Sequence, residues 1–158
     1  MDYKVIERGE IKLVGMMERI IMPNNTTIPQ LWEEFNKRFG EIKNIVGMPC
    51  YGVADNMATE VYSFDETVGV EVSSFEDIPE GMVTKVIPAK KYLVFTHKGL
   101  IVGKNGEMNL SSTYEKIYGD ILPSLDFEVD NDFNFELYDE RFSHDSEESE
   151  FDIYVPVK

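Results

Sequence analysis

Two helical patterns about 80 residues apart, each set among strand-like segments, are the feature that most constrains how this chain folds. The first starts near Pro29 and the second near Leu110, and in both the apolar residues recur at three- and four-residue spacing. Each is preceded by one strand pattern and followed by a strand, a polar loop and another strand. The repeated order of elements predicts an internal duplication.

The strand patterns are runs of branched and aromatic residues bounded by turn residues. The expected strands are residues 12–21, 50–54, 67–72, 82–87, 91–97, 134–142 and 151–157. The expected helices are residues 27–42 and 110–122. Gly15 is expected to form a bulge in the first strand, and residues 55–66 are expected to be a polar connection.

These elements predict an α+β fold in one domain that covers residues 1–158. Its half-repeats, approximately residues 1–80 and 81–158, are each a βαββ unit, and together they form an antiparallel sheet with two main helices. A half that cannot bury its own sheet face is expected to pack against the other half about a pseudo-twofold axis. Such packing leaves a central groove, which is the default expectation for a ligand site.

The charge is strongly negative but uneven. The chain has 158 residues with 15 Lys and Arg against 30 Asp and Glu, a net charge of −15. The stretch from Asp126 to Asp152 carries −11 of this, with Arg141 as its one basic residue. A balance this acidic repels phosphate backbones, so direct nucleic-acid binding is not expected. Most of the acidic stretch is expected to be solvated loop.

Several kinds of protein and site are disfavoured by the residues that the sequence lacks. Cys50 is the one cysteine, so no intramolecular disulfide forms. No signal-peptide pattern and no apolar run of about 20 residues is present, which predicts a cytoplasmic protein without a membrane span. Phosphate-binding glycine loops, nucleophile elbows and metal motifs are missing, so neither a metal nor a cofactor is expected. His97, at the end of a strand, is expected to be structural.

Glu136 is the carboxylate of greatest interest. Alternation along its strand places Glu136 and Tyr138 on one face and Phe135 and Leu137 on the other. A glutamate among aromatic residues on the concave side of a sheet is partly desolvated and attracts a cation, unless it simply points to water. Glu71 is placed similarly in the first half and has the same two interpretations.

The order and spacing of several segments resemble the gyrase-inhibitor-like (GyrI-like) small-molecule-binding domain, over essentially the whole chain. In the second half the matching segments are residues 87–99, 114–118, 122–123, 135–138 and 151–158. In the first half they are residues 31–32, 51–53 and 68–72. No single motif is diagnostic, and the resemblance depends on their order.

The resemblance implies a duplicated βαββ (SHS2-like) fold with a ligand groove between its halves. In multidrug-sensing transcription regulators such a domain holds cationic, lipophilic compounds with a buried glutamate and aromatic neighbours. Glu136 matches that glutamate, and Tyr92, Tyr114 and Tyr154 are the aromatic residues whose surrounding motifs align best. The full set of candidate ligand-binding residues is Glu136, Tyr92, Tyr114, Tyr154, Tyr51, Trp32, Glu71, Phe95 and Tyr138.

Three functions follow as hypotheses. The first is a stand-alone effector-binding protein that holds a small organic ligand; no helix-turn-helix region is present, so regulation would run through a partner protein. The second is a hydrolase of reactive electrophiles, in which Glu136 is the base and Tyr138 or Tyr154 orients the water. The third is an inhibitor whose acidic stretch mimics nucleic acid against a partner such as gyrase. The first is favoured, because it needs a pocket and no catalytic pair.

Overall fold

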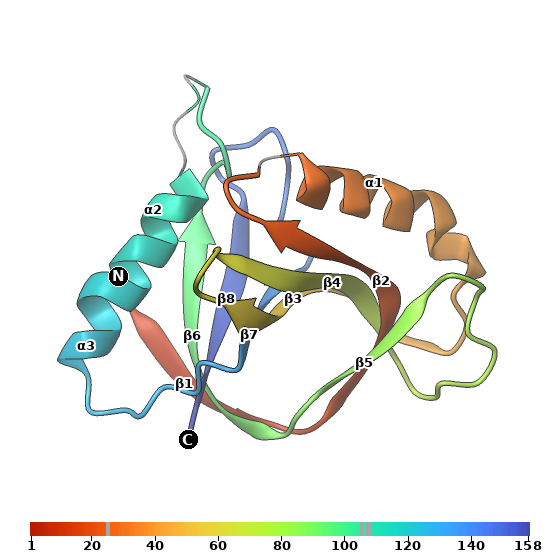
Figure 1. Cartoon of the computed structure of the whole chain (residues 1–158), viewed down its shortest axis with the longest axis horizontal. Coiled ribbons are helices and arrows are strands. Elements are labelled where there is room, and N and C mark those ends of the chain that lie inside the picture. The colour runs from red at the N-terminus through yellow and green to blue at the C-terminus, as the bar shows by residue number, and fades with distance from the viewer. Residues whose placement is uncertain (25, 105, 107–108) are drawn as a thin grey trace.

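One antiparallel sheet with helices on one of its faces organises the molecule (Figure 1). The computed structural model describes residues 1–24, 26–104, 106 and 109–158. Its eight strands are β1 (Tyr3–Arg8), β2 (Ile11–Ile21), β3 (Ile45–Ala58), β4 (Ser63–Val72), β5 (Val83–Ile87), β6 (Lys90–Lys98), β7 (Phe133–Tyr138) and β8 (Glu150–Val157). Its helical segments are α1 (Thr27–Arg38), the 3-10 turn η1 (Phe39–Glu41), α2 (Asn109–Glu115), the π-helix η2 (Lys116–Ile121) and α3 (Leu122–Ser124).

The strand order is β1-β6-β8-β7-β3-β4-β2-β5. The series β2-α1-β3-β4 and β6-α2-β7-β8 repeat the order strand, helix, strand, strand, and they meet where β7 pairs with β3. The two edge strands are exchanged, because β1 pairs with β6 of the second half and β5 with β2 of the first. The predicted α+β class with an antiparallel sheet is confirmed, and the pseudo-twofold relation of the halves stays a prediction.

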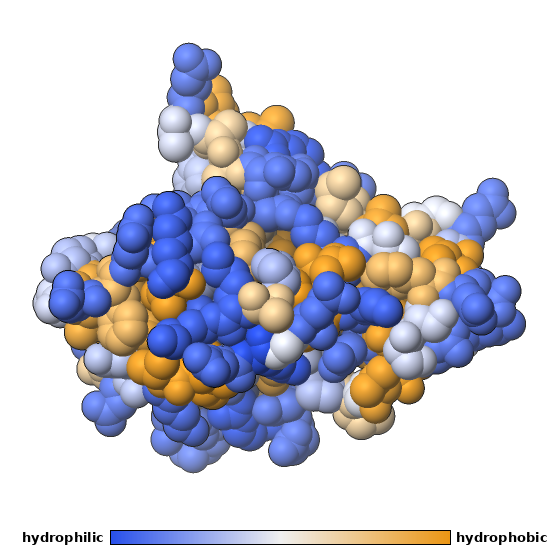
Figure 2. Space-filling view, turned by 90° about the horizontal axis from the view of Figure 1, so that it is seen from below, coloured by the Kyte–Doolittle hydropathy of each residue, from blue (hydrophilic) through white to orange (hydrophobic). Residues whose placement is uncertain are grey.

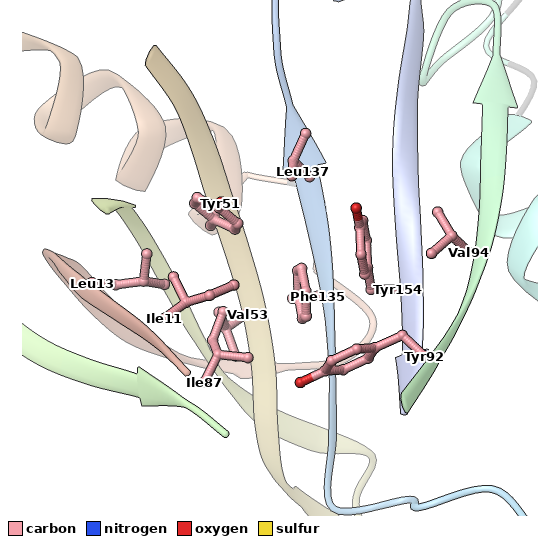
Figure 3. Close-up of a cluster of buried hydrophobic side chains, with 10 residues drawn as sticks. All are labelled: Ile11, Leu13, Tyr51, Val53, Ile87, Tyr92, Val94, Phe135, Leu137 and Tyr154. Atoms are coloured by element: carbon pink, nitrogen blue, oxygen red, sulfur yellow. The ribbon is translucent and has the colours of Figure 1, made fainter. Parts of the chain in front are cut away.

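The two faces of the sheet carry different cores. On the helix face, Leu31 and Phe35 of α1 pack on Val68 and Val70 of β4, while Ile117 of η2 lies in a separate cluster with residues of β6 and β8. The opposite face is concave, since the sheet curls so that β2 and β5 approach β6 and β8 across β3 and β7 (Figure 3). The middle strands therefore lie between α1 and α2 on one side and an aromatic cluster on the other.

A close approach of two strands accompanies this curl. Gly15 of β2 lies opposite Gly69 of β4, and a Cβ atom on Gly15 would stand 1.7 Å from the carbonyl oxygen of Val68. Two opposed glycines allow a tight bend because neither carries a side chain. The expected bulge at Gly15 is wrong, since the β2–β4 register runs without a break from Leu13 to Ile21.

The connection expected at residues 55–66 is mostly strand, because β3 continues to Ala58 and β4 begins at Ser63. Its polar groups pair across the sheet: Arg19 of β2 donates to Asp65 at 3.1 Å and to Ser63 at 2.8 Å. The cross-strand partners explain how a polar sequence forms a hairpin here.

Three further boundaries differ from expectation. Strand β1 was not expected, since most of its side chains are exposed and it shows no clear alternation. β7 ends at Tyr138 because a turn follows, in which the Arg141 N–H donates to Asp139 at 3.0 Å. The second helix continues to Ser124 and includes the π-helical turn η2. None of the described helices has the length and apolar character needed to cross a membrane.

Candidate functional site

Glu136 lies at the centre of the helix face, where β7 pairs with β3 and Gly52 stands opposite it. Tyr138, two residues along β7, donates its hydroxyl to Oε1 of Glu136 at 2.5 Å. Tyr114 of α2 donates to Oε2, also at 2.5 Å. The carboxylate is thus held from its own strand and from a helix. Such short hydrogen bonds are typical of a charged acceptor.

Aromatic rings from both halves surround this carboxylate. The indole of Trp32, from α1, packs edge-on against Tyr138 with ring centroids 5.3 Å apart. Tyr118 of η2 stacks on Tyr114 at 6.3 Å, and Asn134 donates to the Tyr118 hydroxyl at 3.2 Å. The negative ring faces and the carboxylate together form a site suited to an organic cation.

The electrostatics of Glu136 reflect its depth. Burial raises the pKa of its carboxyl, while the hydroxyls of Tyr114 and Tyr138 work in the opposite direction. Burial and the adjacent carboxylate raise the pKa of both tyrosines well above their usual value, so they remain hydrogen-bond donors. Glu136, Tyr114, Tyr138 and Trp32 nevertheless each keep part of their surface accessible. Groups that are deep but accessible are where a ligand finds strong electrostatic contacts.

Glu66 of β4 is a second carboxylate beside this site that the sequence reasoning missed. It is 6% exposed; burial raises the pKa of its carboxyl well above its usual value, and the charge of Glu136 adds to the shift. Alternation along β4 could have identified it, because Glu66 lies on the same face of the strand as Val68 and Val70, which pack against α1. The prediction of a polar connection at residues 55–66 hid that signal.

Three of the predicted tyrosines lie on the opposite, concave face (Figure 3). Tyr51 accepts a hydrogen bond from Arg8 at 2.7 Å, and Tyr154 stacks on Phe135 at 4.5 Å. Tyr92 donates to the carbonyl of Pro88 at 2.7 Å, and burial raises its pKa to about 12. These side chains belong to a packed cluster, separated from Glu136 by the sheet itself.

Glu71 and Phe95 also lie away from Glu136. Glu71 is half-buried and pairs with Leu13 of β2, whose side chain is part of the concave cluster. Phe95 is fully buried in the cluster that includes Ile117. The structure thus brings together Glu136, Tyr114, Tyr138 and Trp32, and places Tyr51, Tyr92, Tyr154, Glu71 and Phe95 elsewhere.

A groove of about 460 Å³ lies on the concave side, between the two halves. Asp55, Lys85 and Asp132 line it together with Val53 and Phe133. Lys85 forms an ion pair with Asp55. Figure 2 shows the underside of the molecule, much of which is covered by hydrophilic residues. This polar groove is on the other side of β3 from the carboxylate pair.

Several carboxylates of the acidic stretch, residues 126–152, form ion pairs within the fold. Arg141 bridges Asp139 at 2.9 Å and Asp152 at 2.8 Å, while Asp130 pairs with Lys90 at 2.6 Å. The paired guanidinium and ammonium groups hold the pKa values of Asp139 and Asp130 below their usual range. Several of these acids therefore fix the ends of β7 and β8.

His97 joins β6 to the helix that carries Tyr114. It is 2% exposed; its Nδ1 lies 2.8 Å from the hydroxyl of Thr113, and its Nε2 lies 3.3 Å from the carbonyl of Leu100. Burial lowers the pKa of His97 below its usual 6.5. The predicted structural role of this histidine agrees with these contacts.

A pH dependence of stability follows for His97. Because its pKa is lower in the folded state, the unfolded chain takes up the proton first, and stability is lost as the pH falls below 6.5. We expect this group to contribute up to about 1.4 kcal/mol of destabilisation per pH unit over that window. Melting temperatures from pH 7.5 to 5 should show a shallower slope for His97→Gln than for wild type. Equal slopes in His97→Gln and wild type would contradict the assignment.

Comparisons with known proteins agree with this fold. The chain is 32% identical over 159 residues to the transcriptional regulator BrlR of Pseudomonas aeruginosa, covering 99% of this chain but only 56% of BrlR. Its fold matches that of SAV2435 bound to tetraphenylphosphonium, with a TM-score of 0.72, 19% identity and coverage of 100% and 94% of the two chains. An integron cassette protein of Vibrio cholerae matches with a TM-score of 0.66, 16% identity and coverage of 99% and 95%.

One protein family matches nearly the whole chain. The family model described as Cass2, integron-associated effector binding protein, covers residues 4–157. The match agrees with the GyrI-like resemblance of the sequence, which is thereby confirmed. The chain therefore belongs to the Cass2 family of integron-associated effector-binding proteins.

Proposed function

We propose that this effector-binding protein holds a lipophilic organic cation against Glu136, between Trp32, Tyr114 and Tyr138. The observation that carries the proposal is the Glu136 carboxylate, which lies deep among aromatic rings and, within the described part of the chain, has only tyrosine hydroxyls as hydrogen-bond partners. No ion pair to Glu136 is formed by a Lys or Arg of the described ranges. A bound cation would supply the missing positive charge.

Two relatives support the proposal. SAV2435, which shares the fold, binds the lipophilic cation tetraphenylphosphonium. BrlR is a transcriptional regulator, and this chain corresponds to only part of it. We infer that ligand binding here is read out through a regulatory partner. No contact in the described residues specifically favours the hydrolase or the gyrase-inhibitor hypothesis, and both stay predictions.

A pair of ions of equal shape and opposite charge tests the proposal. Tetraphenylphosphonium and tetraphenylborate differ mainly in the sign of their charge, so calorimetric titration with both separates electrostatic recognition from apolar burial. We expect the phosphonium to bind and the borate to bind at least tenfold more weakly, because Glu136 repels it. Equal affinity for the two ions, or no binding of the phosphonium, would reject a cation site.

A further inference from the structure

Glu66 and Glu136 approach the same point in the sheet. Gly52 of β3 has no side chain, and a Cβ atom there would lie 2.9 Å from Oε1 of Glu66 and 3.7 Å from Oε1 of Glu136. It would also lie 3.6 Å from the indole of Trp32. Two carboxylates from different strands and one aromatic ring therefore border a gap that only glycine leaves open.

The two carboxylates differ in their hydrogen-bond partners. Both oxygens of Glu136 accept hydrogen bonds from tyrosines. Glu66 is more than nine-tenths buried, and no group in residues 1–24, 26–104, 106 and 109–158 hydrogen-bonds to its carboxylate. An unpartnered acid at this depth is costly, and its like-charged neighbour adds to the cost.

No Lys or Arg among the residues that the structure describes forms an ion pair with Glu66 or Glu136. The residue opposite Glu66 on β2 is another acid, Glu18, which is exposed. The guanidinium of Arg19, next along β2, is held by Asp65, Ser63 and the carbonyl of Asn56. No described residue therefore supplies a positive charge to either carboxylate.

We propose that Glu66 and Glu136 together select ligands with two closely spaced positive centres, such as aromatic dications. This inference rests on the proposed function, in which Glu136 holds the first centre. Glu66 then holds the second, and the flat face of Trp32 packs against the rings between them. Each carboxylate gains a counter-ion on binding, whereas a monocation leaves one of them uncompensated.

Two flat biaryl probes of similar size test this selectivity. Methyl viologen carries two positive charges and 1-methyl-4-phenylpyridinium carries one. We expect wild-type protein to bind the dication at least tenfold more tightly than the monocation in calorimetric titrations. In Glu66→Gln the preference should fall about tenfold through weaker dication binding, with monocation affinity retained. Glu18→Gln, which changes the exposed acid opposite Glu66, should keep the wild-type preference.

The outcomes separate this inference from the proposed function. If wild type binds the monocation and Glu66→Gln leaves the preference for the dication unchanged, the role of Glu66 is wrong while the cation site at Glu136 stands. If wild type binds tetraphenylphosphonium but neither flat probe, the selectivity for two charges is rejected while the cation site at Glu136 stands; if it binds none of the three, both are rejected. Because glutamine is nearly isosteric and removes an unpartnered buried charge, the variant is expected to fold, which a thermal melt checks.

Discussion

Replacing Glu136 by glutamine is expected to weaken tetraphenylphosphonium binding by about 1–3 kcal/mol, or roughly 5- to 150-fold in Kd. Glutamine keeps the shape of the side chain and its contacts with Tyr114 and Tyr138, but it removes the charge that faces the ligand. Isothermal titration at pH 7.5, with wild type and variant at equal concentrations, measures the difference.

Glu71→Gln is the matched control for this experiment. Glu71 is placed similarly to Glu136 by alternation along its strand, but it pairs with Leu13 at the concave face, and its substitution should leave Kd within twofold of wild type. Glu136→Gln should also melt no lower than wild type, since burial disfavours the charge that it removes. A Glu136→Gln protein that is folded and binds with wild-type affinity would refute the site.

The second large effect concerns folding, at Gly15. A methyl group on Gly15 would stand 1.7 Å from the Val68 carbonyl oxygen and 2.6 Å from the Cα of Gly69, and both are backbone atoms. The strands must separate to admit it, so we expect Gly15→Ala to destabilise the protein by about 3 kcal/mol or more. In a protein of this size that lowers Tm by roughly 6–12 °C, measured by circular dichroism.

Gly40→Ala provides the comparison, because a Cβ atom on Gly40 would meet nothing within 4 Å. It lies in the turn η1 and should stay within about 0.5 kcal/mol of wild type. Were Gly15→Ala to melt together with Gly40→Ala, the tight approach of β2 and β4 would not be a determinant of stability.

The sequence predicts the neighbours of Glu136 on its own strand better than its neighbours on other strands, for a physical reason. Alternation along one strand establishes which residues share a face, so Glu136 and Tyr138 were correctly placed together. It does not say how strands far apart in the sequence pair. Tyr51 is adjacent to Gly52, which pairs with Glu136, so Tyr51 points to the other face. That conclusion requires the β3–β7 register, which local periodicity does not contain.

Glu66 was missed for a different reason, because its part of strand β4 was not predicted. Its hairpin is rich in polar residues, a pattern that predicts a connection, although Arg19 and Asp65 pair across the sheet there. Propensity is a weak guide to strands because cross-strand partners decide which residues a sheet tolerates. Tyr114 was identified through the family resemblance, since helical spacing alone does not say that its hydroxyl reaches β7.

The exchange of edge strands has a consequence for how the protein is made. β1 emerges from the ribosome with the first half, yet its partner β6 is synthesised with the second, and β2 likewise waits for β5. Neither half can form all of its strand pairs alone, and pairing between strands that are far apart in the sequence is slow. The sheet therefore cannot close before β8 has been synthesised, because β8 pairs with both β6 and β7.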